Sequence, residues 1–263
     1  KNNTEILKIN FKNLITLLIY NSYNDTYYIL YKMNNLILVR HGQSQWNKER
    51  RFTGWADVDL TEEGKMEAKK AGELIKELNI EFHAYFTSKL KRAINSLDII
   101  LKTLNKQNIN ITKTDALNER HYGGLTSLNK DEIIKKYGSK QVQIWRRSFD
   151  IPPPPMEDLH PYKNKINSNI LSESLKDTFD RVIPYYENSI KPLLSSKKNI
   201  LIVFHGNSIR ALLMKIFNIS KKKIDGFEIP TGNPLLIEFD DEIKVKKYKY
   251  LDEKRAKKIL FNV

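Results

Sequence analysis

Two histidines occupy the same kind of junction in this sequence. His41 follows the apolar run "NLILV" and Arg40, and His205 follows the apolar run "NILIVF". A glycine comes after each histidine, and glycine lets a ligand approach the backbone closely. An imidazole can act as a covalent nucleophile or as a general acid or base. The two junctions therefore predict one site, in which two imidazoles from distant parts of the chain face the same ligand.

Arg40 indicates that the ligand of this site is an anion. A guanidinium forms bidentate hydrogen bonds with phosphate oxygens. Its charge also disfavours protonation of the adjacent His41, so we expect that ring to be neutral and nucleophilic. Arg92 stands near the start of a predicted helix and can reach the same site, although a surface ion pair explains Arg92 equally well from the residues alone. The combination favours phosphoryl transfer, which needs an aligned nucleophile and cationic donors.

The remaining histidines and the metal-binding residue types give no second site. His83, His121 and His160 lack the strand-glycine context, and we expect them to have structural roles. Neither a His-x-x-x-His pattern nor a carboxylate cluster accompanies the two junctions, so we predict no metal site. The sequence contains no cysteine, which excludes disulfides and a cysteine nucleophile.

Alternating strands and helices position these side chains. Continuous apolar runs predict strands over 35–40, 84–88 and 199–204. Apolar residues at helical spacing predict helices over 62–78, 89–104, 174–194 and 207–217. A late pair of strands is predicted over 234–240 and 243–250. We expect a three-layer α/β fold, with a mostly parallel sheet and helices on both faces. Ligands of such sheets bind beyond the carboxyl ends of the strands, where both histidine junctions lie.

The first 32 residues differ from the rest of the chain. They contain no arginine and are rich in asparagine, tyrosine and isoleucine. Their apolar run "LITLLIY" is shorter than the roughly 20 residues of a membrane span, and no clean cleavage site follows it. We expect residues 1–32 to be an N-terminal extension of unknown role, with a targeting role left open. Residues 33–263 are expected to form a single catalytic domain, with Met33 as a candidate original start.

The composition limits the classes of partner. The chain has 263 residues and a net charge of +14, which suggests nucleic acid, a membrane surface or phosphorylated metabolites as anionic partners. Its lysines form short runs of the kind found on exposed faces. The sequence contains no RNA-recognition aromatic motif, zinc-finger spacing or basic-zipper heptad. We therefore expect no nucleic-acid partner.

Seven blocks of sequence resemble one family. The signature "RHGQSQWN" at 40–47 resembles that of the histidine phosphatase superfamily and, within it, of the cofactor-dependent phosphoglycerate mutases. The resemblance covers about 33–250. It is also carried by "RFTGWADVDLTEEG" at 51–64, "TSKLKRA" at 87–93, "LNERHYGGLTSLNK" at 117–130, "WRRSFDIPPPP" at 145–155, "HGNSIR" at 205–210 and "IPTGNPL" at 229–235. The chain departs from the family at Gln43, where glutamate is usual, and at Ser127, where glycine is common. It also has a shorter stretch between Arg147 and His205.

The resemblance implies a role for each matching residue. His41 would accept the phosphoryl group, while Arg40, Arg92 and His205 would grip that group. Glu119 would be the general acid and base; without the family it passes for half of a surface pair with Arg120. The residues implied to line the phosphoryl pocket are Ser44, Asn47, Thr53, Gly54, Gly206 and Asn207. Those implied to hold the rest of the substrate are Tyr122, Lys130, Arg146 and Arg147.

The resemblance also implies the reaction. It is the interconversion of 3-phosphoglycerate and 2-phosphoglycerate in glycolysis and gluconeogenesis, primed by 2,3-bisphosphoglycerate without a metal, in a cytoplasmic homodimer or homotetramer with no membrane span. A bisphosphate that also carries a carboxylate needs several cations, and the sequence offers five at these positions. A phosphatase or a bisphosphoglycerate synthase with the same phosphohistidine is an alternative. A non-catalytic basic protein that binds nucleic acid is a more distant one.

Overall fold

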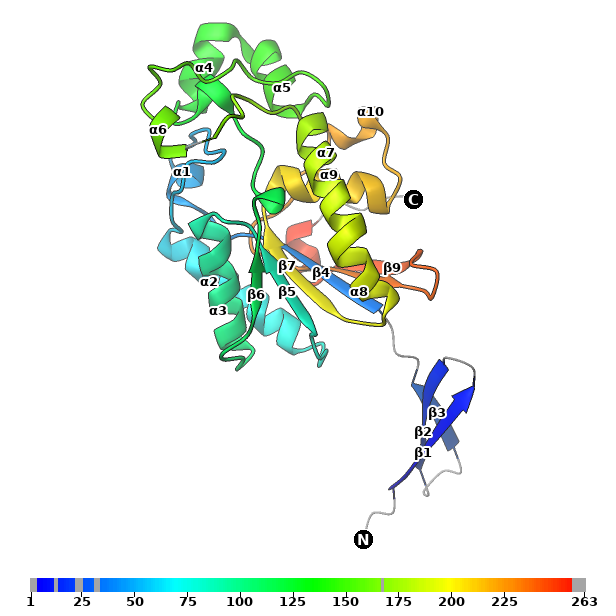
Figure 1. The fold of residues 1–263 in the computed structure, drawn as a ribbon. Helices are drawn as coiled ribbons and strands as arrows, with labels where there is room; N and C mark the ends of the chain where they lie inside the picture. Colours follow the sequence, from blue (N-terminus) through cyan, green and yellow to red (C-terminus); the bar gives the residue numbers. More distant parts are fainter. Residues whose placement is uncertain (1–3, 12–13, 22–25, 31–33, 167, 257–263) are drawn as a thin grey trace.

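The computed structural model describes residues 4–11, 14–21, 26–30, 34–166 and 168–256 (Figure 1). Its centre is a six-stranded sheet with the order β6-β5-β7-β4-β8-β9. The strands are β4 (Asn34–Arg40), β5 (Ala84–Thr87), β6 (Ile111–Lys113), β7 (Ile200–Phe204), β8 (Leu235–Phe239) and β9 (Val245–Tyr250). β4 to β7 are parallel, while β8 and β9 pair antiparallel at one edge. The expected mostly parallel sheet is confirmed.

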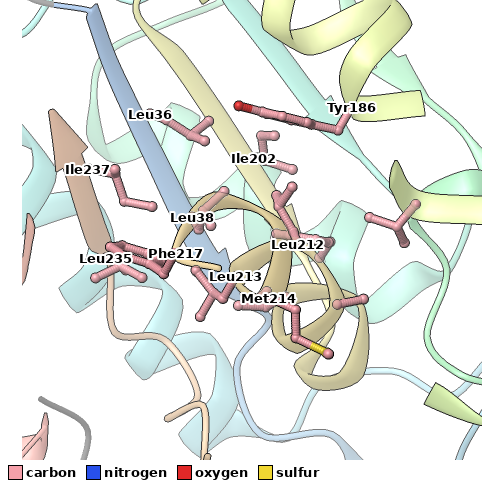
Figure 2. Packing of buried hydrophobic residues seen from close by; sticks show 14 of the residues in the cluster. Leu36, Leu38, Tyr186, Ile202, Leu212, Leu213, Met214, Phe217, Leu235 and Ile237 are labelled. Carbon is pink, nitrogen blue, oxygen red and sulfur yellow. The ribbon is translucent and has the colours of Figure 1, made fainter. Parts of the chain in front are cut away.

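Helices cover both faces of the sheet because its central strands are apolar on both sides. α2 (Glu62–Lys76) and α3 (Lys91–Thr103) cover one face, and α7 (Leu175–Tyr185), α8 (Lys191–Ser195) and α9 (Gly206–Ile216) cover the other (Figure 1). Side chains of a strand alternate between faces. Thus Ile37 and Val39 pack in the cluster of α2 and α3, and Leu36 and Leu38 pack in that of α7 and α9. Figure 2 shows the second cluster around Leu36, Leu38 and Ile202.

The helix predicted over 174–194 is interrupted. It begins as predicted at Ser174, whose side chain accepts from the Asp177 amide, but a π-helical turn (η3, Tyr186–Ile190) separates α7 from α8. Pro184 lies inside α7 and Pro192 at the start of α8. Each proline removes a backbone donor from the helical ladder, and the single regular helix that apolar spacing predicted does not form.

Short elements form a lobe above the sheet, at the top of Figure 1. Phe52, Leu125, Ile133 and Val142 give this lobe a small core of its own. Its elements are α1 (Gln45–Lys48), η2 (Gly123–Leu125), α4 (Lys130–Tyr137), α5 (Ser139–Arg147) and α6 (Lys163–Ile166). The short elements η1 (Asp115–Leu117), α10 (Lys221–Ile224) and η4 (Glu253–Ala256) complete the chain.

The N-terminal extension contains three strands that were not predicted. β1 (Thr4–Phe11), β2 (Leu14–Asn21) and β3 (Thr26–Leu30) form an antiparallel sheet of three strands, which Figure 1 shows apart from the six-stranded sheet. Met33 lies outside the described residues. None of the helices in the described part of the chain combines the length and the apolar character that a membrane span requires.

Candidate active site

The two histidine junctions meet at neighbouring strand ends. β4 and β7 are parallel neighbours in which Arg40 is paired with Phe204, and the His41 amide donates to the Phe204 carbonyl at 3.0 Å. His205 is the N-cap of α9. The centroids of the His41 and His205 rings are 5.0 Å apart. The predicted juxtaposition is therefore present, beside a cavity of about 950 Å³ that His41 lines.

The hydrogen bonds of His41 determine its tautomer. Its Nδ1 lies 2.6 Å from the Gly42 carbonyl oxygen, which can only accept, so Nδ1 carries the proton. Nε2 then holds a lone pair and accepts from Arg92 Nε at 3.3 Å. Burial, Arg92 and Arg40 hold the pKa of His41 well below its usual range. At neutral pH this ring presents an unprotonated Nε2, as a nucleophile requires.

Two arginines lie beside His41 without a carboxylate partner among the described residues. Arg92 is 1% exposed and donates to the carbonyls of Gly54, at 2.7 Å, and Ala56, at 3.0 Å. Burial lowers its pKa to about 10. Arg40 Nη1 donates to the Ile229 carbonyl, and its buried Nε has no partner within the described residues. The surface ion pair considered for Arg92 is therefore excluded, and the positive charge of both groups is available to an anion.

The His205 ring lies beside that of His41 and is fully buried. Its Nε2 is 2.7 Å from Ser88 Oγ, which also accepts from the Leu90 amide. Its Nδ1 finds no partner in the described part of the chain. Burial, Arg92 and His41 lower the pKa of His205 well below its usual range. Ser88 belongs to the block at 87–93 that carries the family resemblance, but no role was predicted for it.

Glu119 reaches the cavity from the segment between η1 and η2. It is 8% exposed, and its Oε1 accepts from the amides of Arg120, at 2.8 Å, and Asn207, at 3.2 Å. The Asn207 amide belongs to the first turn of α9, where the helix dipole favours a carboxylate. Arg120 is itself fully buried, so this is not the surface pair that the residues alone indicate.

Most of the other expected site residues line the same cavity. They are Asn47, Thr53, Gly54, Tyr122, Lys130, Arg146, Arg147, Gly206 and Asn207. Ser44 and His205 do not line it. Ser44 is buried as the N-cap of α1, where its Oγ accepts from the Asn47 amide.

Further cations approach the cavity from the lobe and from α9. Lys130 Nζ donates to the Arg51 carbonyl, and burial lowers its pKa to about 8. Arg147 forms an ion pair of 3.0 Å with the exposed Glu228. Arg210 was not predicted: it lines the cavity, is 2% exposed, and donates to Asn207 Oδ1 at 2.9 Å. Its sequence signals are its place one helical turn after the His205 junction and its position as the last residue of the block at 205–210 that carries the family resemblance.

Gly42 has a different role from the one predicted. We expected it to admit a ligand, but a Cβ at Gly42 would lie 2.0 Å from the Gly64 carbonyl oxygen. A Cβ at Gly64 would in turn lie 2.0 Å from the Gln43 carbonyl oxygen. The two glycines allow the backbones after β4 and at the start of α2 to touch. Gly206 does line the cavity.

The metal-ligating residue types do not form a cluster: within the described residues, no group of three or more His, Cys, Asp or Glu side chains is arranged to hold a metal ion.

The three histidines expected to be structural each accept a hydrogen bond from a backbone amide. His83, His121 and His160 accept through Nδ1 from the amides of Asn199, Gly123 and Tyr162, respectively.

Comparisons with known proteins identify relatives over most of the chain. The sequence profile of the Histidine phosphatase superfamily (branch 1) matches residues 36–249. A 2,3-bisphosphoglycerate-dependent phosphoglycerate mutase of Pelagibacter ubique is 50% identical over 237 residues, covering 87% of this chain and 99% of the relative. The protein of the same name from Hydrogenobaculum sp. is 46% identical, covering 88% of this chain and 98% of the relative.

Solved structures agree with the fold. A mycobacterial glucosyl-3-phosphoglycerate phosphatase superposes with a TM-score of 0.63 at 18% identity, covering 82% of this chain and 96% of that one. Bacillus stearothermophilus YhfR gives a TM-score of 0.63 at 22% identity, covering 80% and 93%. The region that the family profile matches contains both histidine junctions and every residue that lines the cavity except Lys254 and Arg255, which lie beyond residue 249.

Proposed function

The chain belongs to the Histidine phosphatase superfamily (branch 1), and from this we propose that it catalyses the 2,3-bisphosphoglycerate-dependent interconversion of 3-phosphoglycerate and 2-phosphoglycerate. Relatives named 2,3-bisphosphoglycerate-dependent phosphoglycerate mutase are about 50% identical to this chain, over most of its length and nearly all of theirs. The observation that carries the proposal is the unprotonated Nε2 of His41, which faces Arg92 at one end of a cation-lined cavity.

His41 is the phosphoryl carrier in this proposal. Its Nε2 attacks phosphorus, an N–P bond forms, and the bond from phosphorus to the substrate oxygen breaks. Arg40 and Arg92 hold the transferring oxygens, whose charge they neutralise in the transition state. The Ser88 hydroxyl can donate to Nε2 of His205, which places the proton of that neutral ring on Nδ1, where it can donate to a phosphoryl oxygen.

Glu119 supplies and recovers the proton. When the N–P bond forms, Glu119 donates a proton to the departing hydroxyl oxygen. When His41 returns the phosphoryl group, Glu119 takes the proton of the attacking hydroxyl. Its carboxylate is fixed for this exchange by the amides of Arg120 and Asn207.

The cavity fits 2,3-bisphosphoglycerate, which would supply the phosphoryl group that primes His41. Buried donors of Arg40 and His205 have no partner among the described residues, as an incoming phosphate requires. Asn47, Thr53, Gly54, Gly206 and Asn207 would surround that phosphate, with Ser44 holding Asn47. Tyr122, Lys130, Arg146 and Arg147 would hold the second phosphate and the carboxylate at the other end.

The biological setting follows from the same proposal. The reaction belongs to glycolysis and gluconeogenesis, and we propose a cytoplasmic homodimer or homotetramer. We further propose that residues 33–263 form the catalytic domain and that residues 1–32 are a separate extension. The matched region begins at residue 36, within β4.

The test is an assay of the purified chain with 3-phosphoglycerate. Turnover should require trace 2,3-bisphosphoglycerate and persist in a chelator, and His41→Ala should abolish both turnover and acid-labile phosphorylation of the protein. Parallel assays of phosphate release and of bisphosphoglycerate formation distinguish a mutase from a phosphatase or a synthase. Full activity in His41→Ala, or phosphate as the main product, would overturn the proposal.

A further inference from the structure

An ion pair outside the cavity, between the half-buried Arg181 and the buried Glu173, holds the segment that carries Glu119. Arg181 on α7 and Glu173 just before α7 are joined through Nε and Oε1 at 2.7 Å and through Nη2 and Oε2 at 3.0 Å. Their side chains are 17% and 3% exposed. Neither residue lines the cavity, and neither belongs to the mechanism described above.

Every remaining donor of Arg181 is directed at the backbone that leads to Glu119. Nη1 donates to the carbonyl of Ala116 at 2.9 Å and, more weakly, to that of Asp115 at 3.4 Å. Nη2 lies 2.9 Å from the carbonyl oxygens of both Asn118 and Glu119; because its two hydrogens also serve Glu173 Oε2, one of them is shared between two acceptors. One guanidinium therefore ties four carbonyls of a five-residue segment to a long helix.

Glu173 holds the same segment on the other side of Glu119. Its Oε2 accepts from the His121 amide at 2.8 Å, and its own amide donates to the His121 carbonyl at 2.9 Å. The indole of Trp55 donates to the Glu119 carbonyl and lies 5.7 Å from the Arg181 guanidinium. The backbone at Glu119 is thus fixed from both directions along the chain.

This anchoring replaces regular structure. Glu119 lies between the 3₁₀ turns η1 and η2, where no strand or helical ladder holds the main chain. An acid–base group must stay within hydrogen-bond reach of the oxygen it serves, and a displacement of about 1 Å can reduce a rate about 100-fold. The hydrogen bonds from α7 supply the rigidity that the local fold lacks.

We propose that Arg181 and Glu173 are positioning residues for Glu119. This inference rests on the proposed function, in which Glu119 is the acid and base. Without the pair, the Glu119 carboxylate should no longer be held in a fixed position, while the phosphoryl pocket around His41 should stay intact. The loss should therefore affect steps that need proton transfer and spare phosphoryl transfer from donors whose leaving group needs no proton.

The test compares two phosphoryl donors in Arg181→Met and Glu173→Gln. Phosphorylation of His41 is followed by intact-protein mass, with 2,3-bisphosphoglycerate, whose alkoxide leaving group needs a proton, and with p-nitrophenyl phosphate, whose phenolate does not. We expect each variant to slow transfer from the bisphosphate about 10- to 100-fold and to change transfer from the aryl phosphate less than about 3-fold. In the mutase assay, kcat should fall by a similar factor while KM stays within about 3-fold.

Two matched variants make the result interpretable. Lys176→Met removes an exposed ion pair with Asp180 on the same helix and should leave both rates unchanged. Glu119→Gln removes the proton donor itself and should show the largest difference between the two donors. If Glu119→Gln shows no such difference, the role of Glu119 in the proposed function is wrong.

Other outcomes would contradict the positioning role of Arg181 and Glu173 while leaving the proposed role of Glu119 intact. If Glu119→Gln discriminates between the donors and the Arg181 and Glu173 variants slow both donors equally, the pair is merely structural. Unchanged kcat in folded Arg181→Met would also overturn the inference. Arg181→Lys, which retains the charge but donates to fewer carbonyls, covers the case in which Arg181→Met does not fold; it should lose kcat at constant KM, and a wild-type kcat would count against the role.

Discussion

The two ends of the cavity are built in different ways. The floor, which we define as His41 and Arg92 of the cavity lining together with His205, whose ring lies 5.0 Å from that of His41, is at the ends of regular elements and is buried. Apart from the contact between Arg92 and His41, its hydrogen-bond partners are uncharged. The mouth, which we define as Lys130, Arg146 and Arg147, lies on the short helices α4 and α5 and is partly exposed. Arg147 there has a carboxylate partner, Glu228. The floor thus has no ion pair among the described residues, whereas Arg147 of the mouth is paired with a carboxylate.

The largest difference between the ends should appear when Arg92 is replaced. Arg92→Met removes charge from the transition state, and kcat/KM should fall on the order of 10³-fold, mostly in kcat. Steady-state kinetics and the rate of His41 phosphorylation measure the loss. Arg50→Met is the matched control, because Arg50 is exposed and paired with Asp131. An Arg92→Met enzyme with more than a tenth of the original activity would remove the distinction between floor and mouth.

The floor should also make the protein sensitive to acid. His41 and His205 have pKa values in the folded state below those of the unfolded chain, so protonation favours unfolding. Their contribution to stability is complete above about pH 6.5 and declines below it, by up to about 1.4 kcal/mol per pH unit for each ring. Urea titrations from pH 7.5 to 5.5 measure this slope. The double variant His41→Asn and His205→Asn should flatten it, and an unchanged slope would show that the two rings do not cause it.

Replacement of a mouth cation should have a smaller effect and a different signature. Arg147→Met should raise KM for 3-phosphoglycerate about 10-fold with little change in kcat, since it removes binding that substrate and transition state share. Glu228→Gln removes the competing carboxylate and should lower KM slightly. A fall in kcat as large as that of Arg92→Met would place Arg147 functionally in the floor.

The smallest effect is expected from a substitution at Ser127, which belongs to the backbone that supports the mouth residues. Ser127 has a positive φ of 73°, a conformation that favours glycine. Both its main-chain hydrogen bonds, from its amide to the Phe52 carbonyl and from Arg51 to its carbonyl, survive in Ser127→Gly. The substitution should raise the free energy of unfolding by about 0.5–1 kcal/mol, with kcat unchanged. Chemical denaturation measures the change, and destabilisation would mean that the serine side chain contributes more than the backbone costs.

The same contrast explains what could be predicted from the sequence. The two histidines of the floor were predicted from two apolar strands and the residues after them, because parallel neighbours bring their carboxyl ends together. From the residues alone, Arg92 was equally well explained as half of a surface ion pair. Glu119 could not be reached in that way. Its position depends on hydrogen bonds from α7, some 60 residues later, and such partners have no periodic signature. Its assignment came from the family resemblance alone.

The errors have similar causes. Gly42 follows a strand like a ligand-binding glycine, but its missing Cβ makes room for Gly64, a contact between segments that one junction cannot reveal. The break between α7 and α8 was missed because the helix was predicted without regard to Pro184 and Pro192, which lie within it. Arg210 was missed because an arginine within a helix usually indicates an exposed face.

The pairing of Arg40 with Phe204 has a consequence for how this chain can change in length. Strand side chains alternate with a period of two, so one residue lost from β4 or β7 would exchange the two core faces and separate His41 from His205. Gains and losses of residues between Arg147 and Ser174 do not pass through the sheet and would leave that alignment untouched. The stretch between Arg147 and Ser174, which follows α5 and precedes α7, can therefore vary in length while the register of the two strands keeps the histidines together.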